Sequence, residues 1–287
     1  MSAPPSLREA ARAAAAAGGG EAEAAPAGDS ALGALGAAAL DLLEGARGLY
    51  SVFVLTLYYS VRGRREKGAV ALQMYEIGNR SLFFLCVVMA FLGMILVFQA
   101  GVQVQRVVPD LTLLGAQYVE LLVRELAPSV GALMLATRVG AGIAAEIGSM
   151  VVTEQVDALR MCAADPVDFL IKPRFLASLV MTVVLIAFGT AVAYLSGMAV
   201  AYAYFGLLPH TFINPALLDA GDVVVGLAKC VAYGAAIPVV SGYCGLSTYG
   251  GSEGVGWATT RAVVNSSLAV IVLDFFISGA GYLAFPG

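Results

Sequence analysis

The sequence has few charged residues and little of the chemistry that usually holds metals or disulfides. Only 13% of its 287 residues are charged and 60% are apolar, whereas a soluble domain carries about 25% charged and about 45–50% apolar residues. His210 is the only histidine, which excludes a histidine-based metal site within one chain. The cysteines are widely separated and show no CxxC spacing, so we expect small apolar side chains rather than disulfides or metal ligands; they are Cys86, Cys162, Cys230 and Cys244.

Motifs for nucleotide binding and catalysis are also missing. No GxxxxGK[ST] phosphate-binding loop occurs, and the glycine-rich stretch 249–254 has no Lys-Ser or Lys-Thr to complete one. The chain therefore needs a partner subunit for any ATP-driven work, and no cofactor is expected. His210 stands among apolar residues with no serine and aspartate arranged around it, so we expect no enzyme. Nucleic acid is not expected as a partner.

The N-terminal stretch, residues 1–38, is rich in alanine, glycine and proline. No run of 7–15 strongly apolar residues follows a basic start, so a secretory signal is not indicated. We predict a disordered cytoplasmic tail over 1–38 and one domain over 39–287.

Long apolar stretches dominate the rest and predict an all-α membrane protein. A helix needs about 20 residues to cross the hydrocarbon layer, and five segments are long enough: residues 82–104, 111–137, 175–203, 223–245 and 262–284. The apolar stretch 49–61 is too short to cross. Its tyrosines and the basic residues that follow it predict a helix lying in the membrane interface.

Lysine and arginine gather on one side of the predicted spans, which sets the orientation. That side carries Arg62, Arg64, Arg65, Lys67, Arg80, Arg160, Lys172, Arg174 and Arg261. The opposite side carries Arg106, and its 204–222 loop has no lysine or arginine. We therefore place the N-terminus and the 138–174 loop in the cytoplasm and the C-terminus outside.

The 138–174 loop combines two patterns. Gly140, Ala144 and Gly148 recur at four-residue spacing, which permits close approach of helix backbones. The stretch 153–159 (TEQVDAL) predicts a short amphipathic helix with one apolar and one exposed polar face, ended by the Asp-Pro pair at 165–166. From periodicity alone, an ordinary solvated loop helix explains this second pattern equally well.

This region and the last span resemble the MlaE/YrbE-type permeases, the membrane subunits of ABC transporters that work with MCE-domain lipid-binding proteins. The first block of matching residues is 124–128 (RELAP), 138–140 (RVG), 145–150 (AEIGSM), 153–159 (TEQVDAL), 165–166 and 173–175. The second block is 251–256, 258–264 (ATTRAVV), 266–270 (SSLAV) and 274–275. The resemblance covers roughly residues 45–284.

The resemblance implies a five-span homodimer with an interfacial helix and a cytoplasmic coupling helix. It also implies that a groove of a separate ATPase subunit binds the coupling stretch, which here is Glu154, Gln155, Val156, Asp157, Ala158 and Leu159. The expected activity is movement of phospholipids or similar amphiphiles between the inner membrane of a bacterium and a periplasmic MCE-domain partner.

Ionisable residues inside the spans are candidates for the transport site, because a charge in the bilayer normally faces protein or water and has a partner. Lys229 and Asp274 lie at similar estimated depths in antiparallel neighbours, so we predict that they pair. This pair either locks two helices together or shifts during transport.

Arg124 and Glu125 lie in the second span and point about 100° apart on a helix. We predict that Arg124 contacts Glu120 at the i,i+4 distance and that Glu125 faces a cavity at the dimer interface. The resemblance places this Arg-Glu pair near a lipid pocket, which favours a substrate or gating role. The predicted apolar lining residues are Leu121, Leu122 and Leu126, with Phe98 or Tyr118.

Two other classes of protein compete with the permease. In a secondary transporter the buried charges would carry protons or ions, but five spans do not divide into inverted repeats and no internal duplication is seen. An intramembrane lipid enzyme has no convergent histidine, aspartate and serine cluster to support it. The lipid specificity and the direction of transport stay open.

Overall fold

The computed structural model describes residues 27–62, 68–107, 113–214 and 217–284, and these form helices and short connections with no β-strand. The chain divides into two units, residues 1–47 and 48–287. Of the first, the structure describes residues 27–47, the beginning of a helix. The elements in order are α2 (Ala27–Arg62), α3 (Ala69–Val107), α4 (Leu114–Leu121), η1 (Leu122–Leu126), α5 (Ala127–Leu135), η2 (Ala136–Gly140), α6 (Ala141–Val152), α7 (Gln155–Met161), η3 (Val167–Ile171), α8 (Lys172–Phe205), α9 (Pro209–Phe212), α10 (Ala220–Leu246) and α11 (Gly251–Ala284).

Five of these helical stretches are long and apolar enough to cross a membrane, which confirms the predicted all-α fold. They are Ala69–Arg106, Leu114–Val152, Val167–Phe205, Ala220–Leu246 and Gly251–Ala284. The first, second, third and fifth extend well beyond the predicted spans on one side. The prediction counted only the apolar residues that cross hydrocarbon, and it could not show that the polar flanks continue the same helices.

The predicted limits of the tail and of the interfacial helix fall inside one helix. Helix α2 contains both the 49–61 stretch and residues 27–38, whereas residues 1–26 lie outside the described part. The disordered tail therefore stays a prediction. Within the second unit, Val52, Leu55 and Tyr59 pack against the core, and their spacing puts them on one helix face.

The second span continues past Pro128 because the helix widens there. Proline donates no N–H and its ring presses on the carbonyl four residues earlier, which normally kinks an α-helix. Residues Leu122–Leu126 form a π-helical turn, η1, immediately before the α5 segment that begins with Ala127 and Pro128. A second π-helical turn, η2, lies farther along the same span. Such turns are often found at functional sites.

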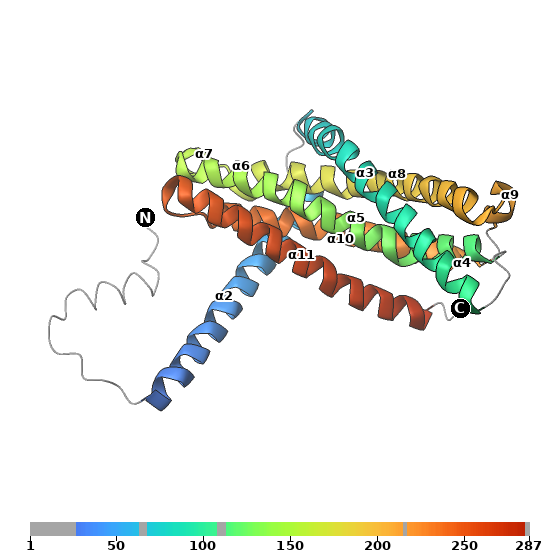
Figure 1. The fold of residues 1–287 in the computed structure, drawn as a ribbon. Helices are drawn as coiled ribbons and strands as arrows, with labels where there is room; N and C mark the ends of the chain where they lie inside the picture. The colour runs from blue at the N-terminus through green and yellow to red at the C-terminus, as the bar shows by residue number, and fades with distance from the viewer. Residues whose placement is uncertain (1–26, 63–67, 108–112, 215–216, 285–287) are drawn as a thin grey trace. The chain divides into compact units, whose positions relative to one another are not determined.

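Small residues bring the helices of the second unit close together. Helix α3 packs along α8, and α6 packs against α10 and α11 (Figure 1). A Cβ on Gly140 would lie 2.9 Å from Ser241 Oγ, and one on Gly148 would lie 2.8 Å from Thr248 Oγ1. The predicted close approach at this spacing is confirmed.

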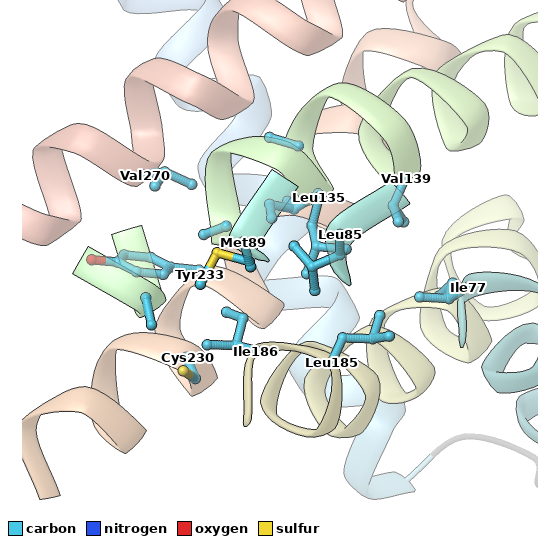
Figure 2. Packing of buried hydrophobic residues seen from close by; sticks show 14 of the residues in the cluster. Ile77, Leu85, Met89, Leu135, Val139, Leu185, Ile186, Cys230, Tyr233 and Val270 are labelled. Carbon is cyan, nitrogen blue, oxygen red and sulfur yellow. The ribbon is translucent and has the colours of Figure 1, made fainter. Parts of the chain in front are cut away.

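The core lies where α3, α5, α8, α10 and α11 meet, as Figure 2 shows. Leu85 and Met89 of α3 and Tyr233 of α10 are fully buried there. The four cysteines are free thiols, and Cys230 and Cys244 are buried apolar fillers.

Candidate functional site

Two neighbouring groups of ion pairs lie between η1, α10 and α11: Arg124 with Asp222, and Lys229 with Glu125 and Asp274. Helix α10 presents Asp222, Gly226, Lys229 and Tyr233 along one face, since these positions follow the helical repeat. A Cβ on Gly226 would lie 2.4 Å from the Val123 carbonyl oxygen, so only glycine lets the η1 backbone come this near. This close contact brings Arg124 and Glu125 within reach of α10.

Lys229 is fully buried between two carboxylates. Its Nζ lies 3.0 Å from Asp274 Oδ1, so the predicted contact between these residues is present, and 2.5 Å from Glu125 Oε2. At about 1.5 Å per residue from the helix ends nearest α9, Glu125, Lys229 and Asp274 lie at ~17, ~14 and ~15 Å. The sequence placed Glu125 deeper than Lys229 because the predicted second span began earlier.

Three hydroxyl groups complete the surroundings of the two carboxylates. Asp274 Oδ1 accepts hydrogen bonds from Tyr233 Oη at 2.6 Å and from Ser129 Oγ at 2.9 Å. Glu125 Oε2 accepts one from Ser278 Oγ at 3.1 Å. The lysine and its two carboxylates carry a formal charge of one negative unit, which these donors stabilise.

The prediction for Arg124 is wrong in its partner. Arg124 Nη1 lies 2.7 Å from Asp222 Oδ1, with both side chains almost completely buried, and does not pair with Glu120. The i,i+4 rule assumes an α-helix, whereas Arg124 lies in the π-helical turn η1, where that spacing no longer aligns side chains. The Tyr282 ring also covers the guanidinium, 4.1 Å from Cζ to the ring centroid.

Asp222 was missed because it falls in the predicted 204–222 loop, outside the predicted spans. A signal for its place did exist: Asp219 and Asp222 stand three residues apart before an apolar run, the spacing of a capping box. The structure contains that box, with Asp222 Oδ2 accepting a hydrogen bond from Asp219 N at 3.0 Å. The hydroxyl donors to Glu125 and Asp274 had no comparable signal.

Not every polar atom in this site has a partner. Within the described part of the chain, Arg124 Nε, Arg124 Nη2 and Glu125 Oε1 are buried and make no hydrogen bond. A buried polar atom without a partner is costly, so these atoms are available to a polar group of another molecule or to water. The site thus offers unpartnered donors on Arg124 and an unpartnered acceptor on Glu125.

The predicted apolar lining residues divide between surface and core. Leu121 is 50% exposed, as a lining residue must be, whereas Leu122 is completely buried in the core. Leu122 therefore contributes to the packed core and forms no open surface in this structure. Tyr118 is also buried, with its hydroxyl donating to the Ala193 carbonyl oxygen at 2.9 Å, whereas Phe98 is exposed.

The coupling stretch lies at the opposite end of the second span. Helix α7 buries Val156, half-buries Leu159 and leaves Glu154, Gln155, Asp157 and Ala158 exposed, the two-faced pattern that the sequence predicted. The chain reverses on both sides of α7, where Glu154 and Ala163 have φ of 58° and 57°. The helix therefore forms a short separate element beside α6 at one end of the bundle (Figure 1).

The loop after α7 is attached to α2. Asp165 Oδ2 accepts a hydrogen bond from Tyr59 Oη at 2.9 Å, and Asp165 Oδ1 accepts one from Val167 N at 2.8 Å. The hydrogen bond to Asp165 raises the pKa of Tyr59 above its ordinary value of 10.0. A groove of about 430 Å³ beside this loop is lined by Arg160, Ala163, Ala164, Asp165, Pro166, Val167 and Leu246.

Five apolar helices with ion pairs buried between them define a multi-pass membrane protein, and comparisons give its family. The protein-family model described as Permease MlaE matches residues 70–280 of this chain. A probable ABC transporter permease protein of Synechocystis is 34% identical over 244 residues, 83% of this chain and 91% of the relative. The intermembrane phospholipid transport system permease protein MlaE of Haemophilus influenzae is 35% identical over 219 residues, 73% and 82% of the two chains.

A plant relative, the chloroplastic protein TRIGALACTOSYLDIACYLGLYCEROL 1 of Arabidopsis thaliana, is 38% identical over 165 residues, 55% of this chain and 47% of that protein. The chain belongs to the MlaE permease family. It is a transport subunit and not an enzyme, in keeping with the permease names of its relatives.

Proposed function

We propose that this chain is the permease subunit of an ABC transporter that moves phospholipids or related lipids between the bacterial inner membrane and a periplasmic MCE-domain protein. Its family membership and the phospholipid transport named for the Haemophilus relative support the substrate class. The short separate helix α7, with its exposed polar face, is the observation that carries the proposal, because it offers a separate ATPase a place to bind.

The proposed ATPase contact is formed by the exposed residues of α7 and by the turn before it. Val156 anchors the helix to the core, so a push on Glu154, Gln155 or Asp157 is transmitted to the end of α6 and thus along the second span. The other half of the same span contains η1, which carries Arg124 and Glu125. In this proposal a movement of α7 therefore reaches the buried charges through the second span.

The proposed orientation places α7 and the N-terminus in the cytoplasm and the C-terminus in the periplasm. The Lys/Arg asymmetry of the connections supports it. The proposed active form is a homodimer. Exposed apolar residues on α11, including Leu268 and Phe275, offer surface for a second copy or for lipid tails.

In this proposal Arg124 and Glu125 contact the lipid head group, and Leu121 contacts an acyl chain. The unpartnered atoms Arg124 Nε and Nη2 suit a phosphate, and Glu125 Oε1 suits a hydrogen-bond donor of the head group. The Lys229–Asp274 contact holds α10 and α11 together beside this site.

The test of ATPase coupling is charge reversal on the exposed face of α7. Asp157→Lys in the full chain, purified with its ATPase partner in lipid nanodiscs, should abolish co-purification of the ATPase and lipid-stimulated ATP hydrolysis. The fold should persist, because Asp157 is exposed and its ion pair with Arg160, at 3.0 Å, is also exposed.

Glu253→Lys is the matched control, since Glu253 is an exposed acid at the same end of the bundle but lies on α11. It should keep the ATPase bound. Equal retention of the ATPase by both variants would contradict the proposed role of α7. Lipid movement by the chain alone in liposomes without ATP would instead favour a secondary transporter.

A further inference from the structure

A pair of arginines lies on the lateral surface of the bundle, away from the buried charges described above. Arg80 of α3 and Arg138 of η2 are both exposed. Arg138 Nη2 donates a hydrogen bond to the Arg80 carbonyl oxygen at 3.3 Å, which holds the Arg138 guanidinium against α3. The Arg138 guanidinium therefore lies beside the backbone of Arg80, a second exposed cationic residue on a different span.

Neither guanidinium has a carboxylate partner within the described part of the chain. Glu76 lies one helical turn before Arg80, yet no ion pair joins them. Glu146 lies about two turns beyond Arg138, but its carboxylate forms an ion pair with Arg174, with 2.7 Å between Glu146 Oε1 and Arg174 Nη2. The pair therefore keeps excess positive charge.

The depth of this pair matches the boundary between hydrocarbon and head groups. On α3 the apolar run begins immediately after Arg80, with Phe83 80% exposed, whereas Tyr75 on the preceding turns is exposed and bonded to Asn79 Nδ2. Aromatic residues of this kind mark membrane interfaces. On the second span, Arg138 follows the apolar α5 segment in the same way.

The backbone near Arg138 leaves room for a ligand. Gly142 lies one turn farther on the same exposed side of the helix, and a Cβ there would meet no atom within 4 Å. Arg138 also occupies the π-helical turn η2, as Arg124 occupies η1. Both arginines of the second span, Arg124 and Arg138, thus lie in π-helical turns.

We propose that Arg80 and Arg138 bind the phosphate of an anionic phospholipid from the leaflet that faces α7. Guanidinium groups bind phosphate through paired N–H donors, and basic pockets between spans on the cytoplasmic side suit acidic head groups. The exposed Phe83 lies on the hydrocarbon side, where an acyl chain would continue. Assigning this leaflet to the cytoplasm rests on the proposed orientation, whereas the site itself does not.

The test measures lipid binding directly and needs no ATPase. The purified full chain is titrated with phosphatidylglycerol or phosphatidylcholine in detergent, and bound lipids are counted by native mass spectrometry. The wild-type chain should retain phosphatidylglycerol preferentially. In Arg80→Gln/Arg138→Gln the preference should fall by about fivefold for each arginine removed. Inorganic phosphate at millimolar concentration should not displace the lipid.

Arg106→Gln is the matched control, because Arg106 is exposed at the other end of α3. It should leave the preference unchanged. A photoreactive phosphatidylglycerol on the wild-type chain should label peptides that contain Arg80 or Arg138, which gives a readout that does not depend on a variant folding.

Three results would overturn the site: equal retention of the two lipids by the wild-type chain, equal loss in the control and double variants, or displacement of the lipid by free phosphate. Disulfide cross-linking of two chains through Arg138→Cys would assign this face to a second copy instead. Loss of lipid preference with ATPase binding intact separates this site from the proposed function.

Discussion

At the residue scale, the buried charges show both the reach and the limit of pairing rules. An isolated charge in a span is unfavourable, and this rule, together with the similar estimated depths of the two residues, led from the sequence to the Lys229–Asp274 contact. The same rule could not select Asp222 for Arg124, because the choice depends on the phase of a π-helical turn and on the missing side chain of Gly226. The spacing of residues in the sequence shows neither the phase of this turn nor how close the two backbones come at Gly226.

Replacement of Lys229 by methionine should destabilise the protein strongly. The change leaves Glu125 and Asp274 facing one another without the cation that lies between them, and removal of one partner from a buried ion pair costs about 3–5 kcal/mol. Thermal unfolding of the purified chain in detergent measures the loss.

Glu125→Gln/Lys229→Met/Asp274→Asn removes all three charges together and should recover much of that stability. An unfolding midpoint of Lys229→Met equal to that of the wild type would show that the lysine does not stabilise the fold. Recovery of stability without recovery of transport would assign the cluster a role in moving lipid.

At the element scale, α7 was predicted well because its signal is local. Val156 and Leu159 are three residues apart, so they share one helix face, and the polar residues between and before them lie on the other. No distant contact is needed to predict these two faces. Its attachment to α2 through Tyr59 and Asp165 could not be predicted, since the two residues are 106 positions apart. Helix ends were the weakest part, because the helices continue through polar sequence beyond the apolar runs.

Tyr59→Phe should loosen the loop after α7 while keeping the ring in place. The lost hydrogen bond is worth about 1 kcal/mol or less, and hydrogen exchange of residues 155–167 should speed up. Tyr58→Phe is the control, because the exposed Tyr58 hydroxyl makes no hydrogen bond within the described residues.

The raised pKa of Tyr59 sets the pH dependence of this effect. The neutral phenol donates the bond, so the protection of the loop is complete below the ordinary tyrosine value of 10.0 and disappears as the pH rises through the raised value. The Tyr59→Phe variant should show no such step. A step of the same size in the variant would mean that another group titrates.

At the scale of the whole molecule, the class and family followed from the sequence, whereas most side-chain contacts between the spans did not. Hydropathy predicts five crossings and the blocks around residues 124–175 and 251–275 carry the family resemblance, which the match over 70–280 confirms. Contacts between spans depend on rotation of each helix about its axis. That rotation becomes visible only when the packed bundle is known.

The proposed orientation predicts where a thiol reagent can enter. Cys162, at the C-terminal end of α7, is exposed, whereas Cys230 and Cys244 are buried. A membrane-impermeant maleimide should label Cys162 in inside-out vesicles and not in spheroplasts. Thr211→Cys, introduced within α9 in a Cys162→Ser background, should show the reverse. Labelling of Cys162 in spheroplasts would invert the topology.

The widened turn at η1 has a genetic consequence. A π-helical turn holds one residue more than the α-helical path between the same end points. Deletion of Val123 should therefore be absorbed locally, with Leu114–Leu121 and Ala127–Leu135 keeping their rotational phase. A single deletion in the regular helix α8, for instance of Val183, should rotate everything beyond it by about 100° and abolish membrane expression. This second span tolerates a shortening that its neighbour cannot.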